Sequence, residues 1–170
     1  MPHDAATVRR RLAALPARCR EAGLEPTSQR RAVYGALLAA KDHPSPEVLF
    51  ERLKPAHPAL SLATVYKALD ALLSLGVVRE VSRLGRTRRF DANVDRHQHL
   101  HCTGCGLVLD FHDDRLSRLA PPRTIRGFVP AEVRVEIVGL CARCASGPRT
   151  SRGPARFPVP QPSHTPTQRT

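Results

Sequence analysis

The stretch LSLATVYKALDALLSLG, residues 60–76, decides the fold of the amino-terminal part of this 170-residue chain. Ser61 can cap a helix by accepting a hydrogen bond from an amide of the first turn, and Gly76 can end that helix. The apolar residues recur at helical spacing: Leu62, Val65, Leu69, Leu72 and Leu73. This spacing places them on one face, so we predict an amphipathic helix that packs against other helices.

Three further helical segments precede this one. The sequence predicts helices over about 8–19, 28–40 and 45–53. The second begins after a capping signal at Thr27-Ser28, and the third has Ser45 as its cap and Pro46 at its first position. The short connection from the third helix to the helix over 61–75 is typical of a helix-turn-helix motif.

A basic hairpin follows these helices. Residues 77–92, VVREVSRLGRTRRFDA, alternate apolar and polar side chains on both sides of a turn at Leu84-Gly85, which predicts a β-hairpin. Its arginines are Arg83, Arg86, Arg88 and Arg89. Helices followed by a basic hairpin indicate a winged helix.

The rest of the chain differs in character. Residues 93–145 contain short strand patterns at 106–111 and 132–140, with a helix predicted around 113–119. The core of a unit of about fifty residues is marginal, and a structural metal is a common remedy. Residues 146–170 are rich in Pro, Ser, Thr and Arg, which predicts a disordered basic tail. We therefore expect an α+β protein with three parts: 1–92, 93–145 and 146–170.

The chain carries a formal net charge of +12. Residues 1–92 hold 16 Lys and Arg against 9 Asp and Glu, whereas residues 93–145 hold 7 against 6. This distribution favours a polyanionic partner such as nucleic acid, bound by the first part. The chain has no apolar run of about 20 residues and no signal-peptide pattern, so we expect a cytoplasmic protein that does not bind membranes.

Four of the five cysteines form two Cys-x-x-Cys pairs: Cys102, Cys105, Cys141 and Cys144. Two such pairs in one small unit are typical of a tetrahedral four-cysteine zinc site that is closed to substrate. Zinc there would connect the first strand of the unit to the end of its last strand. Cys19, the fifth cysteine, lies on a predicted helix and is expected to be a small buried apolar residue.

Three histidines alternate directly before the first cysteine pair, in HQHLH at residues 97–101. Alternate residues of a strand share a face, and a zinc ion bound by four thiolates has no vacancy for them. His97 and His99 therefore indicate a second site, and imidazole with carboxylate suits iron or manganese. The candidate partners are His43, Asp91, Asp95 and Asp110. A structural role explains His101 at least as well as a role as a metal ligand does.

Two other classes of protein share some of these features. A zinc-dependent hydrolase or deaminase needs a glutamate near an open metal site, but the patterns His-x-Glu and His-Glu-x-x-His do not occur. We therefore expect neither an enzyme nor a small organic substrate. A zinc-ribbon module that binds nucleic acid without sensing explains the cysteines and the charge, but it gives the histidine strand no role.

With LATVYKALDAL, RRFDAN, HQHLHCTGC and CARC in this order, the chain resembles the ferric uptake regulator family of metal-dependent repressors. The resemblance covers about residues 8–145. It implies a winged-helix DNA-binding domain over 1–92 and a small α/β dimerisation domain over 93–145. It also implies a homodimer that binds double-stranded operator DNA.

Within that family, the sequence is most similar to the peroxide-responsive repressors. This resemblance implies a regulatory Fe²⁺ or Mn²⁺ bound by His43, Asp91, His97, His99 and Asp110. Aspartate at positions 91 and 110 favours this branch. The resemblance further implies that peroxide oxidises His43 or His97 in the iron form, which releases metal and DNA, whereas manganese represses without sensing. Repressors of the same family that respond to iron supply, zinc or nickel are the alternatives.

For the DNA interface, we expect the helix over 61–75 to supply most contacts. Tyr66 can place its ring against a thymine methyl group, and Lys67 can donate to a phosphate or a base. Thr64 is a further candidate. The wing residues Arg86 and Arg88 are expected to contact phosphates.

One position departs from the family pattern. Glu25 stands where relatives often have a basic residue that enters the minor groove of DNA. Arg30 or Arg31 is the candidate replacement for that contact. The segment before the last strand, with Glu132 and Val133, also lacks the histidines often found there, so we expect no third sensor site.

Overall fold

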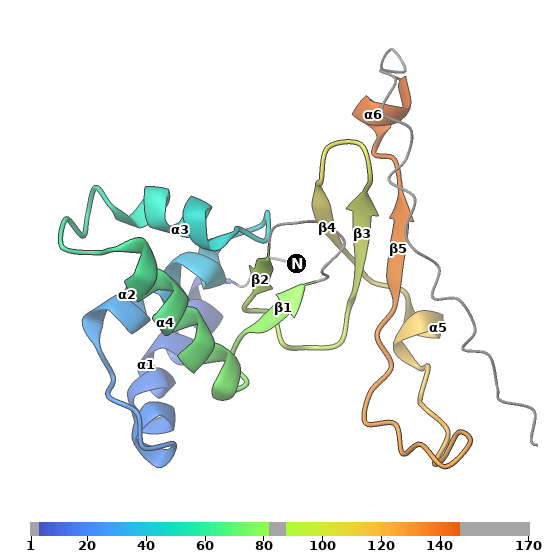
Figure 1. Cartoon of the computed structure of the whole chain (residues 1–170), viewed down its shortest axis with the longest axis horizontal. Helices are drawn as coiled ribbons and strands as arrows, with labels where there is room; N and C mark the ends of the chain where they lie inside the picture. The colour runs from blue at the N-terminus through green and yellow to red at the C-terminus, as the bar shows by residue number, and fades with distance from the viewer. Residues whose placement is uncertain (1–3, 82–87, 147–170) are drawn as a thin grey trace, which may run out of the picture.

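The computed structural model describes residues 4–81 and 88–146, which form a helical part and a sheet part (Figure 1). The helical part consists of α1 (Ala5–Glu21), α2 (Ser28–Ala39), α3 (Pro46–Leu53) and α4 (Leu62–Ser74). A two-stranded sheet of β1 (Arg79–Val81) and β2 (Arg89–Asp91) lies between the two parts. The sheet part consists of β3 (Gln98–Cys102), β4 (Val108–Phe111), α5 (Asp114–Ser117), β5 (Glu136–Gly139) and α6 (Ala142–Ser146).

Side-chain caps set the starts of the helices, as the sequence predicted for three of them. Thr27, Ser45 and Ser61 each accept a hydrogen bond from the backbone amide three residues later. Such caps stabilise a helix by about 1 kcal/mol each, because the first-turn amides have no partner inside the helix. Helix α1 begins three residues earlier than expected. The reason is Asp4, whose carboxylate accepts from the amide of Thr7.

The core of the helical part lies between α2 and α4. The apolar face predicted for α4 is confirmed, because Val65, Leu69 and Leu72 are fully buried. Leu62 and Leu73 flank that face and are half-buried. Burying one such side chain stabilises the fold by roughly 1.5–3 kcal/mol, so this face is the main support of α4.

The predicted hairpin is present in its described residues. Strands β1 and β2 pair antiparallel, with Glu80 opposite Phe90 and Arg79 opposite Asp91. Phe90 is fully buried in the helical core, so the hairpin is fixed to the helices. The tip of the hairpin, residues 82–87 with Arg83 and Arg86, lies outside the described residues.

The second sheet has the strand order β4-β3-β5, with β3 antiparallel to β4 and parallel to β5. His99 lies opposite Asp110 on one side and opposite Glu136 on the other. The predicted strand over 132–140 is shorter in the structure. The pairing with β3 covers only Glu136–Gly139, which lie opposite His99–Cys102. Among the described helices, none is long and apolar enough to cross a membrane.

Candidate metal centres and DNA-binding surface

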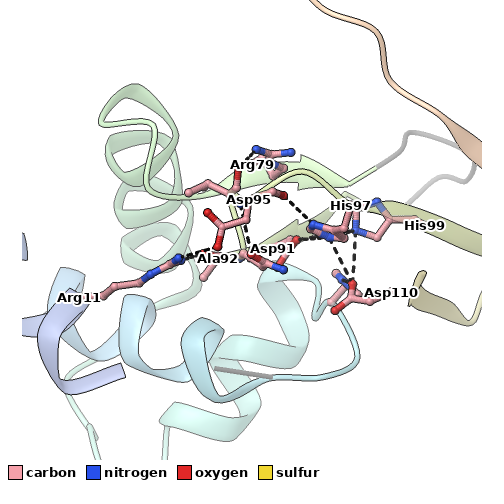
Figure 2. A network of polar contacts seen from close by, with 11 residues as sticks. Arg11, Arg79, Asp91, Ala92, Asp95, His97, His99 and Asp110 are labelled. Atoms are coloured by element: carbon pink, nitrogen blue, oxygen red, sulfur yellow. Dashed lines mark hydrogen bonds and ion pairs between the residues drawn. The ribbon is translucent and has the colours of Figure 1, made fainter. Parts of the chain in front are cut away.

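Five side chains converge between the helical part and the sheet part. They are His43, Asp91, His97, His99 and Asp110, and each offers one ligand atom. All five ligand atoms lie within 4.8 Å of one another. His43, Asp91 and His99 are buried, while His97 and Asp110 are half-buried. Figure 2 shows Asp91, His97, His99 and Asp110 pointing toward one another.

The sheet register explains two of these positions. His99 and Asp110 are directly opposed on β3 and β4, so their side chains leave the sheet on the same face. His97 precedes β3 by one residue and shares that face with His99. The sheet therefore presents three of the five groups to the helical part.

The other two groups come from the helical part and its hairpin. Asp91 ends β2, and His43 lies in the loop between α2 and α3. His43 has a φ of 47°, a left-handed conformation that is uncommon for a residue other than glycine. Arg89 donates to the His43 carbonyl over 3.2 Å, and the Phe90 amide donates to the Pro44 carbonyl over 3.3 Å. These bonds from β2 hold the strained loop against the site.

The polar atoms of the cluster are close together. His43 Nε2 lies 2.8 Å from Asp110 Oδ1, and His97 Nε2 lies 3.0 Å from Asp91 Oδ2. The Nε2 atoms of His97 and His99 are 2.9 Å apart. Two ring nitrogens facing each other can share one proton at most. Three imidazoles and two carboxylates in this arrangement therefore fit a first-row divalent metal ion.

Backbone groups orient two of the ligands. His97 Nδ1 lies 2.8 Å from the Asp95 carbonyl, to which it donates, so Nε2 faces the cluster. The Asn93 amide donates to Asp91 Oδ1 over 2.7 Å, which turns Oδ2 toward His97. Metal sites in proteins commonly use such outer hydrogen bonds to fix ligand geometry.

The electrostatics of the cluster are those of a site that holds a cation. Burial disfavours the charged form of His97, but the carboxylates of Asp110 and Asp91 outweigh it and raise the pKa of His97 to about 10. Burial likewise disfavours charge on Asp91 and Asp110. Hydrogen bonds from the histidines outweigh this effect and hold the pKa of both carboxyl groups well below the ordinary range.

Two of the sequence candidates lie outside this cluster. The carboxylate of Asp95 is 77% exposed and pairs with Arg11. His101 is buried on the same face as His99, with ring centroids 6.3 Å apart. Burial lowers the pKa of His101, which favours its neutral form. It does not belong to the five-residue group.

The four paired cysteines form a second cluster at the end of the sheet part. The Sγ atoms of Cys102, Cys105, Cys141 and Cys144 lie within 4.8 Å of one another, which is consistent with a zinc site. The Cys141 amide donates to Cys102 Sγ over 3.2 Å. Burial raises the pKa of the Cys102 thiol. The amide of Cys141 and other backbone amides outweigh the effect of burial and lower this pKa to about 6.

This second cluster connects distant parts of the chain. Cys102 ends β3, whereas Cys141 and Cys144 follow β5, as the sequence indicated. At Gly104 a Cβ atom would lie 3.0 Å from both Cβ and Sγ of Cys144, so a larger residue would make the two turns give way by a few tenths of an ångström. Cys19 is fully buried in the helical core, as predicted.

Helix α4 carries three of the residues predicted to contact DNA. Lys67 is exposed, and Thr64 and Tyr66 are half-buried. The Tyr66 hydroxyl donates to Glu47 Oε1 over 2.7 Å. Glu47 was not singled out from the sequence, because no local pattern connects it with a residue nineteen positions away.

The arginine candidates differ in their surroundings. The guanidinium of Arg30 donates to the carbonyl of Glu25, which places it beside the position where the family pattern is broken. Arg88 lies 3.1 Å from Glu80 and 3.7 Å from Asp70, and its guanidinium stacks on the Phe90 ring. These contacts tie Arg88 to the hairpin and α4. Arg86 lies outside the described residues.

The comparisons with known proteins agree with this architecture. Residues 21–138 match the profile of the ferric uptake regulator family. The chain is 32% identical over 126 residues to the peroxide-responsive repressor PerR of Staphylococcus epidermidis, covering 74% of this chain and 84% of that protein. It is 34% identical over 128 residues to PerR of Staphylococcus aureus strain Mu50, covering 74% and 85%.

Solved structures share the fold. The ferric uptake regulator of Pseudomonas aeruginosa with manganese has a TM-score of 0.60 at 26% identity, covering 75% of this chain and 98% of that one. A zinc uptake regulator complexed with zinc and DNA has a TM-score of 0.57 at 26% identity, covering 82% and 95%. The fold, the two candidate metal centres and the sequence match together show that the chain belongs to the ferric uptake regulator family of transcriptional regulators.

Proposed function

We propose that the protein is a metal-dependent, DNA-binding transcriptional repressor. The observation that carries this proposal is the convergence of five ligand groups from both parts of the molecule at one buried point. In this proposal Cys102, Cys105, Cys141 and Cys144 bind structural Zn²⁺. His43, Asp91, His97, His99 and Asp110 bind regulatory Fe²⁺ or Mn²⁺.

Metal binding at the five-residue cluster would fix the orientation of the two parts. His43 and Asp91 belong to the helical part and its hairpin, and the other three groups belong to the sheet part. A ligand shifts a conformational equilibrium by its difference in affinity for the two states. The state that completes the cluster is therefore the one that metal stabilises. We assign residues 1–92 to the DNA-binding domain, 93–145 to the dimerisation domain and 146–170 to a basic tail.

The sheet part has a surface suited to a homodimer. Leu109, Leu100 and Ile137 are cross-strand neighbours on the face of the sheet opposite the histidines. Leu109 is 43% exposed and Ile137 is 40% exposed. Within the described residues, β5 is an edge strand of this sheet, and exposed apolar edges commonly pair with another chain. A dimer sets the distance between two copies of α4 along operator DNA.

DNA binding would use α4 and its surroundings. Lys67 can contact a phosphate or a base edge, and Tyr66 presents a ring that Glu47 holds in one orientation. Thr64 and Arg30 complete the described surface, and Arg86 and Arg88 belong to the wing. The hydrogen bonds of Arg88 favour a role in placing the wing, with phosphate contact through its remaining donors.

For the signal, we favour peroxide over metal supply. Two curated relatives are peroxide-responsive repressors, and aspartate at positions 91 and 110 supports the same branch. A ferrous ion would supply the one-electron chemistry that activates peroxide. His43 and His97 would both hold the ion, so a ring C–H of either imidazole could take up one oxygen atom of peroxide while the other oxygen atom leaves as water. Oxidation of either ring would weaken metal binding and thus release DNA.

The second candidate is a repressor that reports iron supply, or zinc or nickel supply, through the same five residues. The ferric uptake regulator with manganese that shares this fold supports it. A zinc-ribbon module without sensing is less favoured, because it gives the buried five-residue cluster no role.

The test compares zinc-filled protein loaded with ferrous iron and the same protein loaded with manganese. Both are exposed to a low concentration of peroxide, and peptide mass mapping and operator binding are measured in the same samples. Iron-dependent addition of one oxygen atom to His43 or His97, together with loss of DNA binding, would support peroxide sensing. Intact histidines, with DNA released by metal removal alone, would favour the metal-supply repressor.

A further inference from the structure

Arg11 of helix α1 binds the segment that connects the two parts of the molecule (Figure 2). Its Nη1 donates to the Ala92 carbonyl over 2.8 Å, and its Nη2 lies 3.2 Å from Asp95 Oδ2. We call residues 92–95 the hinge segment, because they lead from β2 toward β3. One guanidinium therefore holds both ends of the hinge segment to α1.

The same hinge segment is bonded to two of the five cluster residues. The Asn93 amide donates to Asp91 Oδ1 over 2.7 Å, and His97 Nδ1 donates to the Asp95 carbonyl over 2.8 Å. Asp95 thus contacts His97 through its backbone and Arg11 through its side chain. The hinge segment is therefore bonded to Asp91 and His97 on one side and to Arg11 on the other.

Arg11 is itself firmly placed in the helical part. Leu15 and Cys19, on the same helix, are buried in the core that α1 shares with α2 and α4. The Arg11 side chain is 19% exposed, but Asp95 is 77% exposed, so the ion pair alone contributes little. The more directional contact is the bond to the Ala92 carbonyl. On the other side, Arg79 of β1 donates to the Val94 carbonyl.

We propose that Arg11 is a positioning residue that transmits the state of the five-residue cluster to the DNA-binding helices through the hinge segment. This inference rests on the proposed function. Energetic coupling between two sites is reciprocal and is carried by elements with discrete arrangements. When metal holds Asp91 and His97, the hinge segment takes the arrangement that Arg11 binds, and α1 is held in the orientation that suits DNA.

The test compares Arg11→Met with Arg9→Met, which removes the same charge from an exposed position of the same helix. The Kd for DNA is measured on zinc-filled protein with and without Mn²⁺. The probe is a duplex selected from random sequence by the manganese-loaded wild-type chain. The Kd without Mn²⁺ divided by the Kd with Mn²⁺ measures the coupling between metal binding and DNA binding. We expect Arg11→Met to lower that ratio about three- to tenfold, and Arg9→Met to change both Kd values equally and leave the ratio unchanged.

Hydrogen exchange gives a second readout that does not depend on DNA. Mn²⁺ should slow the exchange of amides in both the hinge segment and α1 of the wild type, but only in the hinge segment of Arg11→Met. The inference would be overturned if Arg11→Met and Arg9→Met had equal ratios of Kd values. It would also be overturned if Mn²⁺ slowed the exchange of α1 amides equally in the wild type and in Arg11→Met. If the Kd of the wild type for DNA does not change with Mn²⁺, the proposed function fails. The exchange of α1 amides then still decides whether Arg11 transmits metal binding to α1.

Discussion

Metal binding at the five-residue cluster should release a proton from His97. In the metal-free protein the pKa of His97 is about 10, so this side chain is charged at neutral pH. At about pH 7.5 the pKa of His97 lies about 2.5 units above the pH of the solution, and the ion must displace the proton that His97 holds. At 1.36 kcal/mol per unit this costs about 3 kcal/mol of binding free energy.

The sign of the pH dependence follows from the raised pKa. Because protons compete with metal at His97, a higher pH removes the competitor, and the affinity for Mn²⁺ should rise about tenfold per pH unit between roughly pH 7.5 and 8.5. The assay is isothermal titration of zinc-filled protein with Mn²⁺ in buffers of different ionisation enthalpy. The slope of the observed heat against that enthalpy gives the number of protons released.

We expect about one proton per ion from His97. As a control, His112→Ala, whose side chain is exposed and lies outside the cluster, should release the same number of protons as the wild type. Heats that do not depend on the buffer, combined with an affinity that does not change with pH, would refute the reasoning. They would mean that His97 is neutral before metal arrives.

Three further predictions concern the other parts of the molecule. Cys102→Ser should lose zinc and the pairing of β3 with β5, because structural zinc contributes about 10–16 kcal/mol of binding free energy, as metal analysis and circular dichroism would show. Lys67→Ala should weaken binding to all duplexes alike and lower the salt dependence of log Kd by about one unit. Ile137→Asp should shift the protein toward monomer in sedimentation experiments, whereas Val48→Asp, at a similarly exposed position on α3, should not.

Local signals in the sequence predicted local structure well. The caps at Ser45 and Ser61 were predictable because cap and amide lie three residues apart, and the fully buried face of α4 followed from its spacing. The ends of helices and strands were less predictable. The start of α1 depends on Asp4, and the length of β5 depends on how far it pairs with β3, which no pattern within residues 132–140 records.

The candidate site was predictable to a different degree. Alternation on a strand indicated that His97 and His99 share a face, and the structure brings them together. His43 was one of several candidate partners, and only the family resemblance selected it, because its position depends on a strained loop that β2 holds. Contacts such as Arg11 with Ala92 join residues far apart in the chain, so they require the fold to be known.

The central claim is that an ion bound by the five-residue cluster controls DNA binding. The most direct test titrates Mn²⁺ into zinc-filled protein with a labelled duplex selected on the loaded chain, for the wild type, His99→Ala and His112→Ala. His112 is exposed and lies outside the cluster. We predict that DNA affinity rises as one ion binds per chain of the wild type and of His112→Ala, and that His99→Ala does not respond. DNA affinity that ignores Mn²⁺ in the wild type, or a full response in His99→Ala, would contradict the claim.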